Sequence, residues 1–429
     1  MNSSVCVVGG GWAGMAAAVE LAGAGVPVTV FEAASVLGGR ARRVNFQGTV
    51  LDNGQHLLLG AYRETLAAIA RVTDSATVLR RTPLHIEMTG ELCLVAGRGP
   101  APLHLLLGLM GARGLTWRER LEAVRLLTAA RLAGFRVERP GTVEEFLAHH
   151  RQPAALRRAL WEPLCIAALN TGPEIADAQT FLNVLRDGLA AGRAASDLVF
   201  PRVDLSAMFP EPAAAFVAAR GGSVHLGEPV TSITALGAGF EITTAARRAP
   251  FEHVIWATDP VRAGRALSGL GGLQTVCESI DRLEHAPIVT VYLRYDVPGA
   301  LFAQGMTGDN RGPAQWFFDR GLLCGQPGWV GAVLSAASRW RGIPREDLAA
   351  RVARQAQPLV ADRLPSEHLV VTEKRATFQC VPNLRRPDQR TPLPRLHLAG
   401  DYTASDYPAT LESAVRSGRL CARAVLEAP

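Results

Sequence analysis

The chain has 429 residues, of which 48% are hydrophobic and 20% are charged, so it is long enough to bury a large core and is globular rather than disordered. Its 45 basic and 39 acidic side chains give a net charge of +6, and Lys374 is the only lysine. The arginines form no long basic run, which argues against nucleic acid as a partner but leaves a mild attraction to anionic lipid.

The N-terminal segment predicts a buried strand, a glycine-rich turn and a helix in immediate succession. Residues 5–8 are apolar, Gly9, Gly11 and Gly14 follow with the spacing G-x-G-x-x-G, and residues 15–24 are again apolar. The first glycine permits a tight turn, the second lets a pyrophosphate approach the backbone, and the third lets the helix pack close to the strand. The residues of this turn that we expect at a dinucleotide are Gly9, Gly11, Trp12, Ala13 and Gly14.

A second predicted strand, over residues 26–31, ends at Glu32, which lies 18 residues after Gly14. In dinucleotide folds a carboxylate at about this distance accepts hydrogen bonds from a ribose diol. A glycine-rich turn alone can be only a turn, but here the strand, the helix, the second strand and the acid occur together. We therefore predict that Glu32 contacts the ribose and that the adjacent Ala33 also lies at the cofactor.

The stretch after Glu32 contains a second glycine pair and an arginine, Gly38-Gly39-Arg40. This pattern resembles the flavin-binding fingerprint of the amine oxidase and phytoene desaturase superfamily, in which the arginine lies along the diphosphate. The resemblance implies a Rossmann-type FAD-binding domain of α/β class, interleaved with a substrate domain of mixed sheet and helices. It also implies non-covalent FAD, contacted by Gly39, Arg40 and Ala41. The alternative is a surface turn with a solvated arginine.

The seven cysteines are scattered without a CxxC pair, so we expect reduced core thiols in a cytosolic protein and no metal site. The first strand begins within four residues of the N-terminus, which leaves no room for a cleaved signal peptide. No apolar run reaches the roughly 18 residues of a membrane span. We expect a cytoplasmic protein that is either soluble or associated with the inner face of the cytoplasmic membrane.

Gly54, Gln55 and His56 form a polar turn between apolar segments. Such a turn either lines a pocket beside the flavin or satisfies its polar groups with its own backbone. Residues 99–112 carry no formal charge when His104 is neutral, and arginines flank them. This segment is either a buried helix of the substrate domain or a helix that dips into a membrane interface.

Further helices are expected over residues 117–136 and from a capping box at Thr142 and Glu145. A mostly apolar helix over residues 161–171 is expected to line a hydrophobic cavity. The chain then returns to the nucleotide domain with a short strand over residues 224–226. By the superfamily resemblance, Val230 lies near the adenine.

In the second half of the chain, the predicted strand over residues 288–295 is the richest in β-branched and aromatic residues. Residues 315–318 and 329–334 are expected to extend the same sheet. Without repeats or low-complexity linkers, the domains are expected to interleave. We assign FAD binding to residues 1–75, 201–262 and 389–429, a helical substrate segment to 76–200, and a sheet-containing substrate segment to 263–388.

The last forty residues are expected to close the flavin site. A strand over residues 396–401 ends in Gly400-Asp401, and a loop then leads to Ala409-Thr410-Leu411 at the start of the final helix. The superfamily resemblance implies that Gly400 and Asp401 contact the ribityl chain or diphosphate. It also places residues 409–411 at the pyrimidine end of the flavin, where a helix N-terminus stabilises negative charge.

Several segments together resemble one branch of this superfamily, the hydroxysqualene dehydroxylases of bacterial hopanoid synthesis. These segments are residues 53–56, 161–164, 168–171, 373–378, 400–403 and 407–412. The resemblance implies reductive removal of an allylic hydroxyl from hydroxysqualene, a polyprenyl lipid, in squalene biosynthesis. It implies contact with other squalene-pathway enzymes and an external electron donor, since no second dinucleotide fingerprint appears.

The implied chemistry needs an acid near the hydroxyl and a dry, apolar tunnel, because the allyl cation left by the hydroxyl must capture hydride from the flavin before water reaches it. Gln55 and His56 are our candidates for the catalytic polar groups. The alternative functions are a carotenoid desaturase of the phytoene type, which runs hydride transfer in the other direction, and a flavin amine oxidase. A flavin-bound lipid carrier without turnover is the non-enzymatic alternative.

Overall fold

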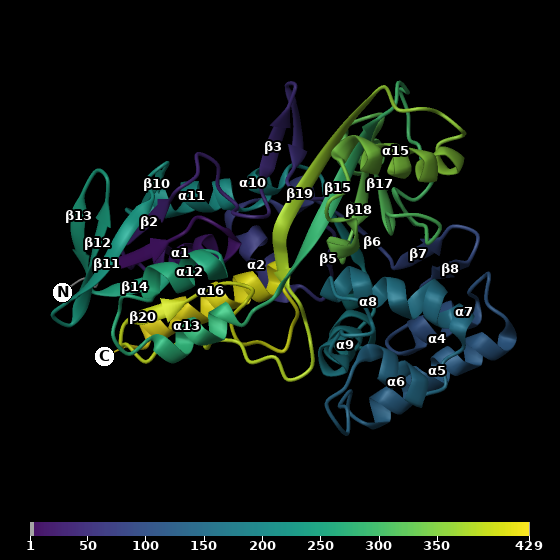
Figure 1. Ribbon diagram of the computed structural model, residues 1–429, viewed down its shortest axis with the longest axis horizontal. Coiled ribbons are helices and arrows are strands. Elements are labelled where there is room, and N and C mark those ends of the chain that lie inside the picture. Colours follow the sequence, from purple (N-terminus) through teal and green to yellow (C-terminus); the bar gives the residue numbers. More distant parts are fainter. Residues whose placement is uncertain (1–3, 429) are drawn as a thin grey trace.

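The computed structural model describes residues 4–428 and has three regions (Figure 1). A parallel sheet with its helices lies at the left of the view, a second sheet lies at the upper right, and a lobe of helices lies at the lower right. Purple, teal and yellow segments meet in the first region, so the start, the middle and the end of the chain build it together.

The parallel sheet has five strands in the order β10-β2-β1-β14-β20. Its central strand is buried along its whole length, as expected of a parallel sheet covered on both faces. Val5 and Val7 pack with the helices, whereas Cys6 and Val8 belong to the core on the opposite face. The strands are β1 (Val5–Val8), β2 (Val28–Glu32), β10 (Ser223–Leu226), β14 (His253–Trp256) and β20 (Leu396–Leu398).

One face of this sheet is covered by helices and the other by a small antiparallel sheet. The first helix begins at Trp12 rather than at the predicted Met15, because Gly11 is its N-cap and the end of the glycine motif is already helical. It contacts both α11 and α16. The elements are α1 (Trp12–Gly23), α2 (Arg63–Val72), α10 (Leu205–Met208), α11 (Pro210–Ala218), α16 (Leu411–Leu426), β11 (Val230–Leu236), β12 (Gly239–Thr244) and β13 (Arg248–Phe251).

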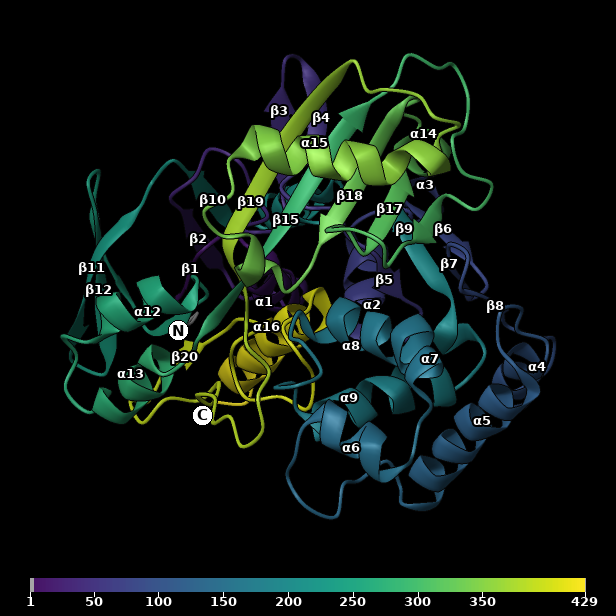
Figure 2. The same cartoon turned by 45° about the vertical axis from the view of Figure 1, so that its right-hand side comes forward.

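The second sheet has seven strands in the order β19-β15-β18-β17-β16-β7-β8. The predicted strands over residues 288–295, 315–318 and 329–334 are confirmed as neighbours in it. Helix α15 (Arg345–Ala356) crosses one face (Figure 2). The strands are β7 (His85–Met88), β8 (Leu92–Val95), β15 (His285–Arg294), β16 (Met306–Gly308), β17 (Trp316–Asp319), β18 (Trp329–Leu334) and β19 (Glu367–Phe378).

The helical lobe lies beside this sheet in both views (Figures 1 and 2). The predicted capping box of Thr142 and Glu145 is confirmed. The helix predicted over residues 117–136 ends at Leu132, because Gly134 takes a φ of +62°. The helices are α4 (Leu103–Met110), α5 (Trp117–Leu132), α6 (Val143–His149), α7 (Ala154–Leu156), α8 (Glu162–Leu169) and α9 (Ala178–Leu185), with π-helical turns at Arg157–Trp161 and Arg186–Ala190.

Helix α4 lies within the uncharged segment 99–112 and is buried on one side only. His104, Leu105 and Leu109 are buried, whereas Leu106 and Leu107 are 38% and 47% exposed. The segment is therefore neither wholly core nor wholly surface. No helix within residues 4–428 combines the length and the apolar character that crossing a bilayer requires.

Short elements connect the three regions, and a two-stranded hairpin carries the chain from the first glycine-rich segments to the polar turn at residues 54–56. The seven cysteines are free, and five of them are buried. The connecting elements are β3 (Arg43–Phe46), β4 (Thr49–Asp52), β5 (Leu58–Leu59), α3 (Ser75–Val78), β6 (Leu79–Thr82), β9 (Leu198–Pro201), α12 (Pro260–Leu267), α13 (Gln274–Asp281) and α14 (Arg320–Cys324).

Candidate active site

One cavity of about 1580 Å³ brings the predicted site residues together. Its walls come from the glycine-rich turn, the polar turn at residues 54–56, Val230, residues 400–401 and residues 409–411, together with both sheets and the lobe. Every predicted site residue lines this cavity except Gly14. That glycine lies behind the turn, where an added Cβ would collide with the Gly9 carbonyl oxygen.

The glycine-rich turn fits a diphosphate. Gly9 has a φ of +112°, and an added Cβ would lie 2.6 Å from the Ala257 carbonyl oxygen, so only glycine suits this position. At Gly11 the space is open, since the nearest atom to an added Cβ is Gly39 Cα at 3.8 Å. A phosphate group can therefore approach the backbone at Gly11, at the N-terminus of α1. Because two glycine motifs face one another here, the cradle fits the predicted FAD.

Glu32 stands at the end of β2 and braces the turns on either side. Its Oε2 accepts from Gly10 N at 2.6 Å, and its Oε1 accepts from Ala34 N at 2.8 Å. Each carboxylate oxygen keeps a second lone-pair position, so the side chain can accept from two ribose hydroxyls at the same time. The position agrees with the predicted ribose contact.

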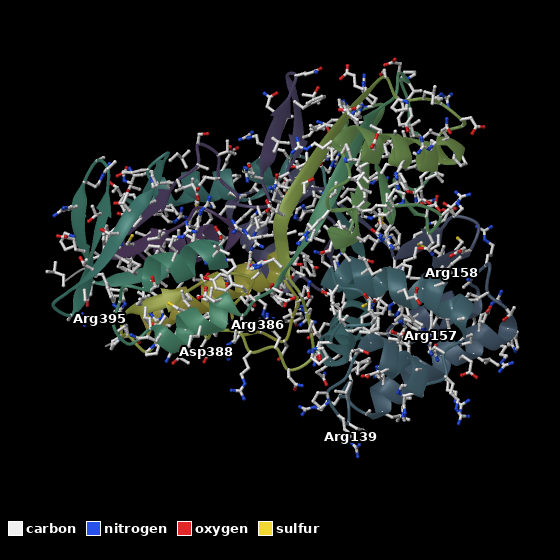
Figure 3. All side chains as sticks on the ribbon, viewed as in Figure 1. Arg139, Arg157, Arg158, Arg386, Asp388 and Arg395 are labelled. Carbon is white, nitrogen blue, oxygen red and sulfur yellow. The ribbon has the colours of Figure 1, made fainter. Side chains whose placement is uncertain are left out.

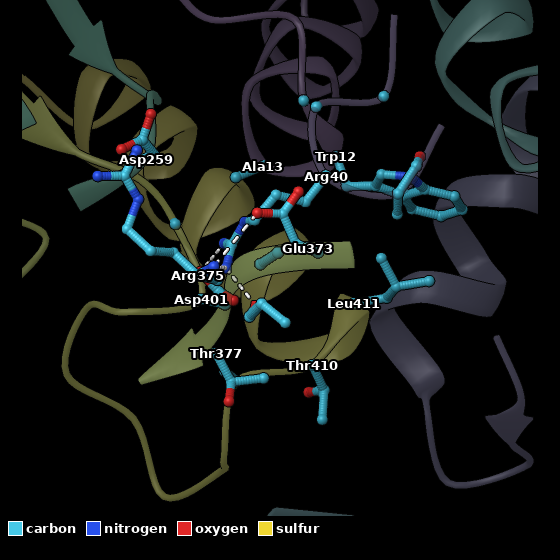
Figure 4. A pocket seen from close by; sticks show the side chains of 18 of the residues that line it. Trp12, Ala13, Arg40, Asp259, Glu373, Arg375, Thr377, Asp401, Thr410 and Leu411 are labelled. Atoms are coloured by element: carbon cyan, nitrogen blue, oxygen red, sulfur yellow. Dashed lines mark hydrogen bonds and ion pairs between the residues drawn. The ribbon is translucent and has the colours of Figure 1, made fainter. Parts of the chain in front are cut away.

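Arg40 and Asp401 form a direct ion pair, with Nη2 and Oδ1 2.5 Å apart. Arg40 also donates to the Ala376 carbonyl oxygen at 2.6 Å, which ties the flavin fingerprint to β19. Glu373, Arg375 and Asp259 surround this pair (Figure 4). No ligand role could be predicted for these three residues from the sequence, because they stand on a polar strand and at a helix cap with no spacing that predicts a ligand. Glu373 and Arg375 entered only as part of the segment 373–378 that carries the family resemblance.

The N-terminus of α16 opens onto the cavity. Ala409, Thr410 and Leu411 line it, and the Thr410 hydroxyl caps the helix by accepting from Ser413 N at 3.1 Å. The positive end of a 16-residue helix therefore lies where the superfamily resemblance puts the pyrimidine end of the flavin. A flavin bound with its pyrimidine end here would be stabilised in its reduced, negatively charged form.

The polar turn holds Gln55 and His56 at the cavity wall. His56 Nδ1 lies 2.8 Å from the Gly54 carbonyl oxygen, so Nδ1 carries the proton of the neutral ring. Burial lowers the pKa of His56, and Arg40 acts in the same direction, against the Gly54 hydrogen bond and the charge of Asp52. The imidazole is therefore neutral near pH 7, with Nε2 as an acceptor.

Behind this turn lies a buried ion pair that the sequence did not reveal. Arg320 Nη1 lies 3.2 Å from Asp52 Oδ2, and the two side chains are only 3% and 5% exposed. The same Nη1 donates to Gln55 Oε1 at 2.7 Å. The Tyr292 hydroxyl donates to the Asp52 carbonyl oxygen at 2.9 Å. In the sequence, only the position of Asp52 at the end of an apolar run suggested a buried charge. Its partner could not be identified, because Asp52 and Arg320 are 268 residues apart.

The part of the cavity between the seven-stranded sheet and the helical lobe is mainly apolar. The prediction that the helix over residues 161–171 lines a hydrophobic cavity is confirmed. Asp187 is the charged group of the lobe at this wall, where it accepts from the Tyr407 hydroxyl at 2.7 Å and pairs with Arg186. Apolar lining residues are Leu164, Ala167, Phe181, Val184, Met306, Trp316 and Phe318.

Comparisons with known proteins agree with this geometry. Residues 12–426 match the model of a family described as flavin containing amine oxidoreductase. Hydroxysqualene dehydroxylases of Rhodopseudomonas palustris and Sinorhizobium fredii are 31% and 30% identical to this chain. These alignments cover 100% and 98% of this chain and 99% and 98% of the relatives.

A probable zeta-carotene desaturase of Synechococcus elongatus is 25% identical, over 99% of this chain and 98% of its own length. Among solved structures, a putrescine oxidase variant superposes with a TM-score of 0.74 at 18% identity, covering 99% of both chains. The predicted amine oxidase-like fold, with an FAD-binding domain interleaved with a substrate domain, is confirmed.

Proposed function

The chain belongs to the family of flavin-containing amine oxidoreductases and is an FAD-dependent enzyme, and on this basis we propose that it reduces hydroxysqualene to squalene. The observation that carries the proposal is the full-length similarity to two hydroxysqualene dehydroxylases at 30% identity or more. The apolar cavity beside the flavin cradle supports a polyprenyl substrate, because a hydrocarbon chain is stabilised by leaving water.

The cavity also argues against an amine as the substrate. A bound ammonium needs an uncompensated carboxylate nearby, since burying an unpaired charge is costly. At the lobe wall Asp187 already pairs with Arg186 and accepts from Tyr407. Carotenoid desaturation is the second candidate function, because the full-length relative from Synechococcus elongatus is a probable zeta-carotene desaturase.

We assign the polar chemistry of the reaction to Gln55 and His56. The Gln55 amide holds the substrate hydroxyl, and His56 protonates its oxygen after Nε2 has taken up one proton, so that water leaves. Reduced FAD, when bound, supplies the hydride that replaces the hydroxyl. The sum is an allylic alcohol, a hydride and a proton giving a hydrocarbon and water. The apolar wall of α8 and α9 keeps other water from the reacting carbon.

The test is anaerobic mixing of dithionite-reduced enzyme with hydroxysqualene and, in separate samples, of oxidised enzyme with phytoene and with a polyamine. We expect hydroxysqualene to reoxidise the flavin and to yield squalene. A desaturase would instead reduce oxidised flavin with phytoene, and an amine oxidase would reduce it with the polyamine. Either of those results, without reoxidation by hydroxysqualene, would refute the proposal.

We further propose that the enzyme takes its lipid from an anionic membrane surface through α4 and the start of α5. On this side Leu103, Leu106 and Leu107 are exposed together with Trp117 and Leu121. The exposed arginines among them are Arg98, Arg113, Arg118 and Arg125. Exposed leucines bordered by arginines suit the boundary between acyl chains and anionic headgroups.

Arginines elsewhere on the lobe add to its positive charge. Arg139, Arg157 and Arg158 lie on the lobe (Figure 3). Such a surface attracts anionic vesicles more strongly than neutral ones, and salt weakens the attraction. This proposal also includes the domain division given above and a cytoplasmic location at the inner face of the membrane. It further includes contacts with squalene-pathway enzymes and an external electron donor.

A further inference from the structure

We propose that Gln55 and His56 form a subsite specific for an alcohol hydroxyl. The buried Asp52–Arg320 pair orients the Gln55 amide so that its donor, Nε2, faces the ligand. The inference rests on the proposed function for the identity of the alcohol. It adds a positioning role for Asp52 and Arg320, and it explains why neither a hydrocarbon nor an ammonium group suits the site.

The first step concerns the amide of Gln55. A guanidinium group has donors and no acceptor, so Arg320 requires the oxygen of the amide to face it. The 2.7 Å contact from Arg320 Nη1 to Gln55 Oε1 meets this requirement. The amide Nε2 is thereby turned away from Arg320, and its one hydrogen-bond partner within residues 4–428 is the His56 carbonyl oxygen at 3.5 Å. Its donor capacity remains for a ligand.

The second step concerns why Arg320 itself cannot turn. Its Nε donates to Gln326 Oε1 at 2.6 Å while Nη1 donates to Asp52 Oδ2 at 3.2 Å. Asp52 is held in turn, because its Oδ1 accepts from Leu205 N at 2.9 Å. With both side chains almost fully buried, the pair is a rigid backing for the amide.

Room for this arrangement comes from a glycine on the neighbouring strand β18. An added Cβ at Gly331 would lie 3.3 Å from Gln55 Oε1 and 3.4 Å from the Tyr292 ring. Such a contact is tighter than ordinary packing, so a side chain there would press against the amide oxygen. Glycine at position 331 therefore leaves the space on β18 that the Gln55 amide oxygen occupies.

The third step concerns His56. Its Nδ1 proton is committed to the Gly54 carbonyl oxygen, so the neutral ring offers Nε2 as an acceptor with no partner among the described residues. The turn thus presents one donor and one acceptor side by side. An alcohol meets both, because its oxygen accepts from Gln55 and its hydrogen is donated to His56. A hydrocarbon meets neither, and an ammonium opposes the Gln55 donor.

The experiment measures dissociation constants of hydroxysqualene and squalene for the oxidised holoenzyme, from the change in flavin absorbance. Two added hydrogen bonds predict roughly tenfold to hundredfold tighter binding of the alcohol. Gln55→Glu keeps an acceptor for Arg320 but replaces the donor facing the ligand. The double variant Asp52→Asn/Arg320→Gln frees the amide without leaving an isolated buried charge.

Both variants should lose the preference for the alcohol while the squalene constant and the FAD content stay the same. Arg80→Gln is the matched control: Arg80 donates to the Leu322 carbonyl oxygen on α14 at 2.8 Å and does not line the cavity. It should keep the preference. If Gln55→Glu keeps it, the subsite is wrong, and if only the double variant keeps it, the role of the pair is wrong.

This binding measurement uses oxidised enzyme and requires no turnover. A wild-type enzyme that prefers the alcohol but is not reoxidised by it would overturn the proposed reaction and leave the subsite intact. A wild-type enzyme that turns over but binds both lipids equally would overturn the subsite alone.

Discussion

Replacing Glu32 by alanine tests the dinucleotide site where its geometry is clearest. The carboxylate accepts from Gly10 N at 2.6 Å and from Ala34 N at 2.8 Å, and it faces the cavity at the end of β2. The change removes the two hydrogen bonds that we propose Glu32 accepts from the ribose, each worth about 1.5–3 kcal/mol because the acceptor is charged. The summed loss of about 3–6 kcal/mol corresponds to roughly a 10²–10⁴-fold weaker affinity for FAD.

The assay is titration of deflavinated protein with FAD and, separately, with FMN, by quenching of flavin fluorescence. FMN lacks the adenosine ribose, so Glu32→Ala should weaken FAD and leave FMN unchanged. Glu20→Ala is a matched control, because Glu20 pairs with Arg71 and Arg419 away from the cavity. It should change neither affinity.

Two outcomes would refute the reasoning. Undiminished FAD affinity in Glu32→Ala would remove Glu32 from the ribose site. An equal loss of FAD and FMN affinity would mean that Glu32 acts only as a brace for the turns at Gly10 and Ala34.

The other predictions concern catalysis, the membrane and packing. His56→Ala should slow single-turnover reoxidation by hydroxysqualene roughly 10²–10⁴-fold with unchanged FAD content. Because the pKa of His56 is lowered and the protonated ring is the donor, the wild-type rate should fall as pH rises through that lowered pKa. A rate independent of pH would contradict this role of His56. Leu106→Glu with Leu107→Glu should abolish flotation with anionic vesicles while the flavin spectrum stays the same, and retained flotation would disprove the surface. Gly14→Ala should give protein that does not retain FAD, because its Cβ collides with backbone, whereas Gly192→Ala meets open space and should behave as wild type; normal FAD retention in Gly14→Ala would contradict the close packing.

The nucleotide half of the site could be predicted from sequence because its residues are local. The glycine motif, Glu32 and Arg40 lie within one short stretch whose order of strand, turn, helix and acid has a physical reason at each position. The structure places them together with the distant residues Asp401 and Thr410, which the superfamily resemblance had supplied.

The ion pair behind Gln55 could not be predicted in the same way. Asp52 ends β4 and Arg320 begins α14, and no periodicity or spacing relates two residues 268 positions apart. Helix α4 was ambiguous for another reason. An uncharged segment looks the same whether one side or both are buried, and only the packing of His104 and Leu109 identifies the inner side.

The parallel sheet takes its strands from the start, the middle and the end of the chain, and this has a consequence for biosynthesis. β1 pairs with β2 and with β14, and β14 pairs with β20 close to the C-terminus, so the sheet is completed only when nearly the whole chain has been made. Contacts so distant in sequence slow folding and expose apolar surface while the chain is incomplete. Because Asp401 and the first turn of α16 also complete the cradle, the nascent protein captures its cofactor only after synthesis is almost finished. Prematurely ended chains therefore lack the ligand that would stabilise them and become substrates for proteolysis.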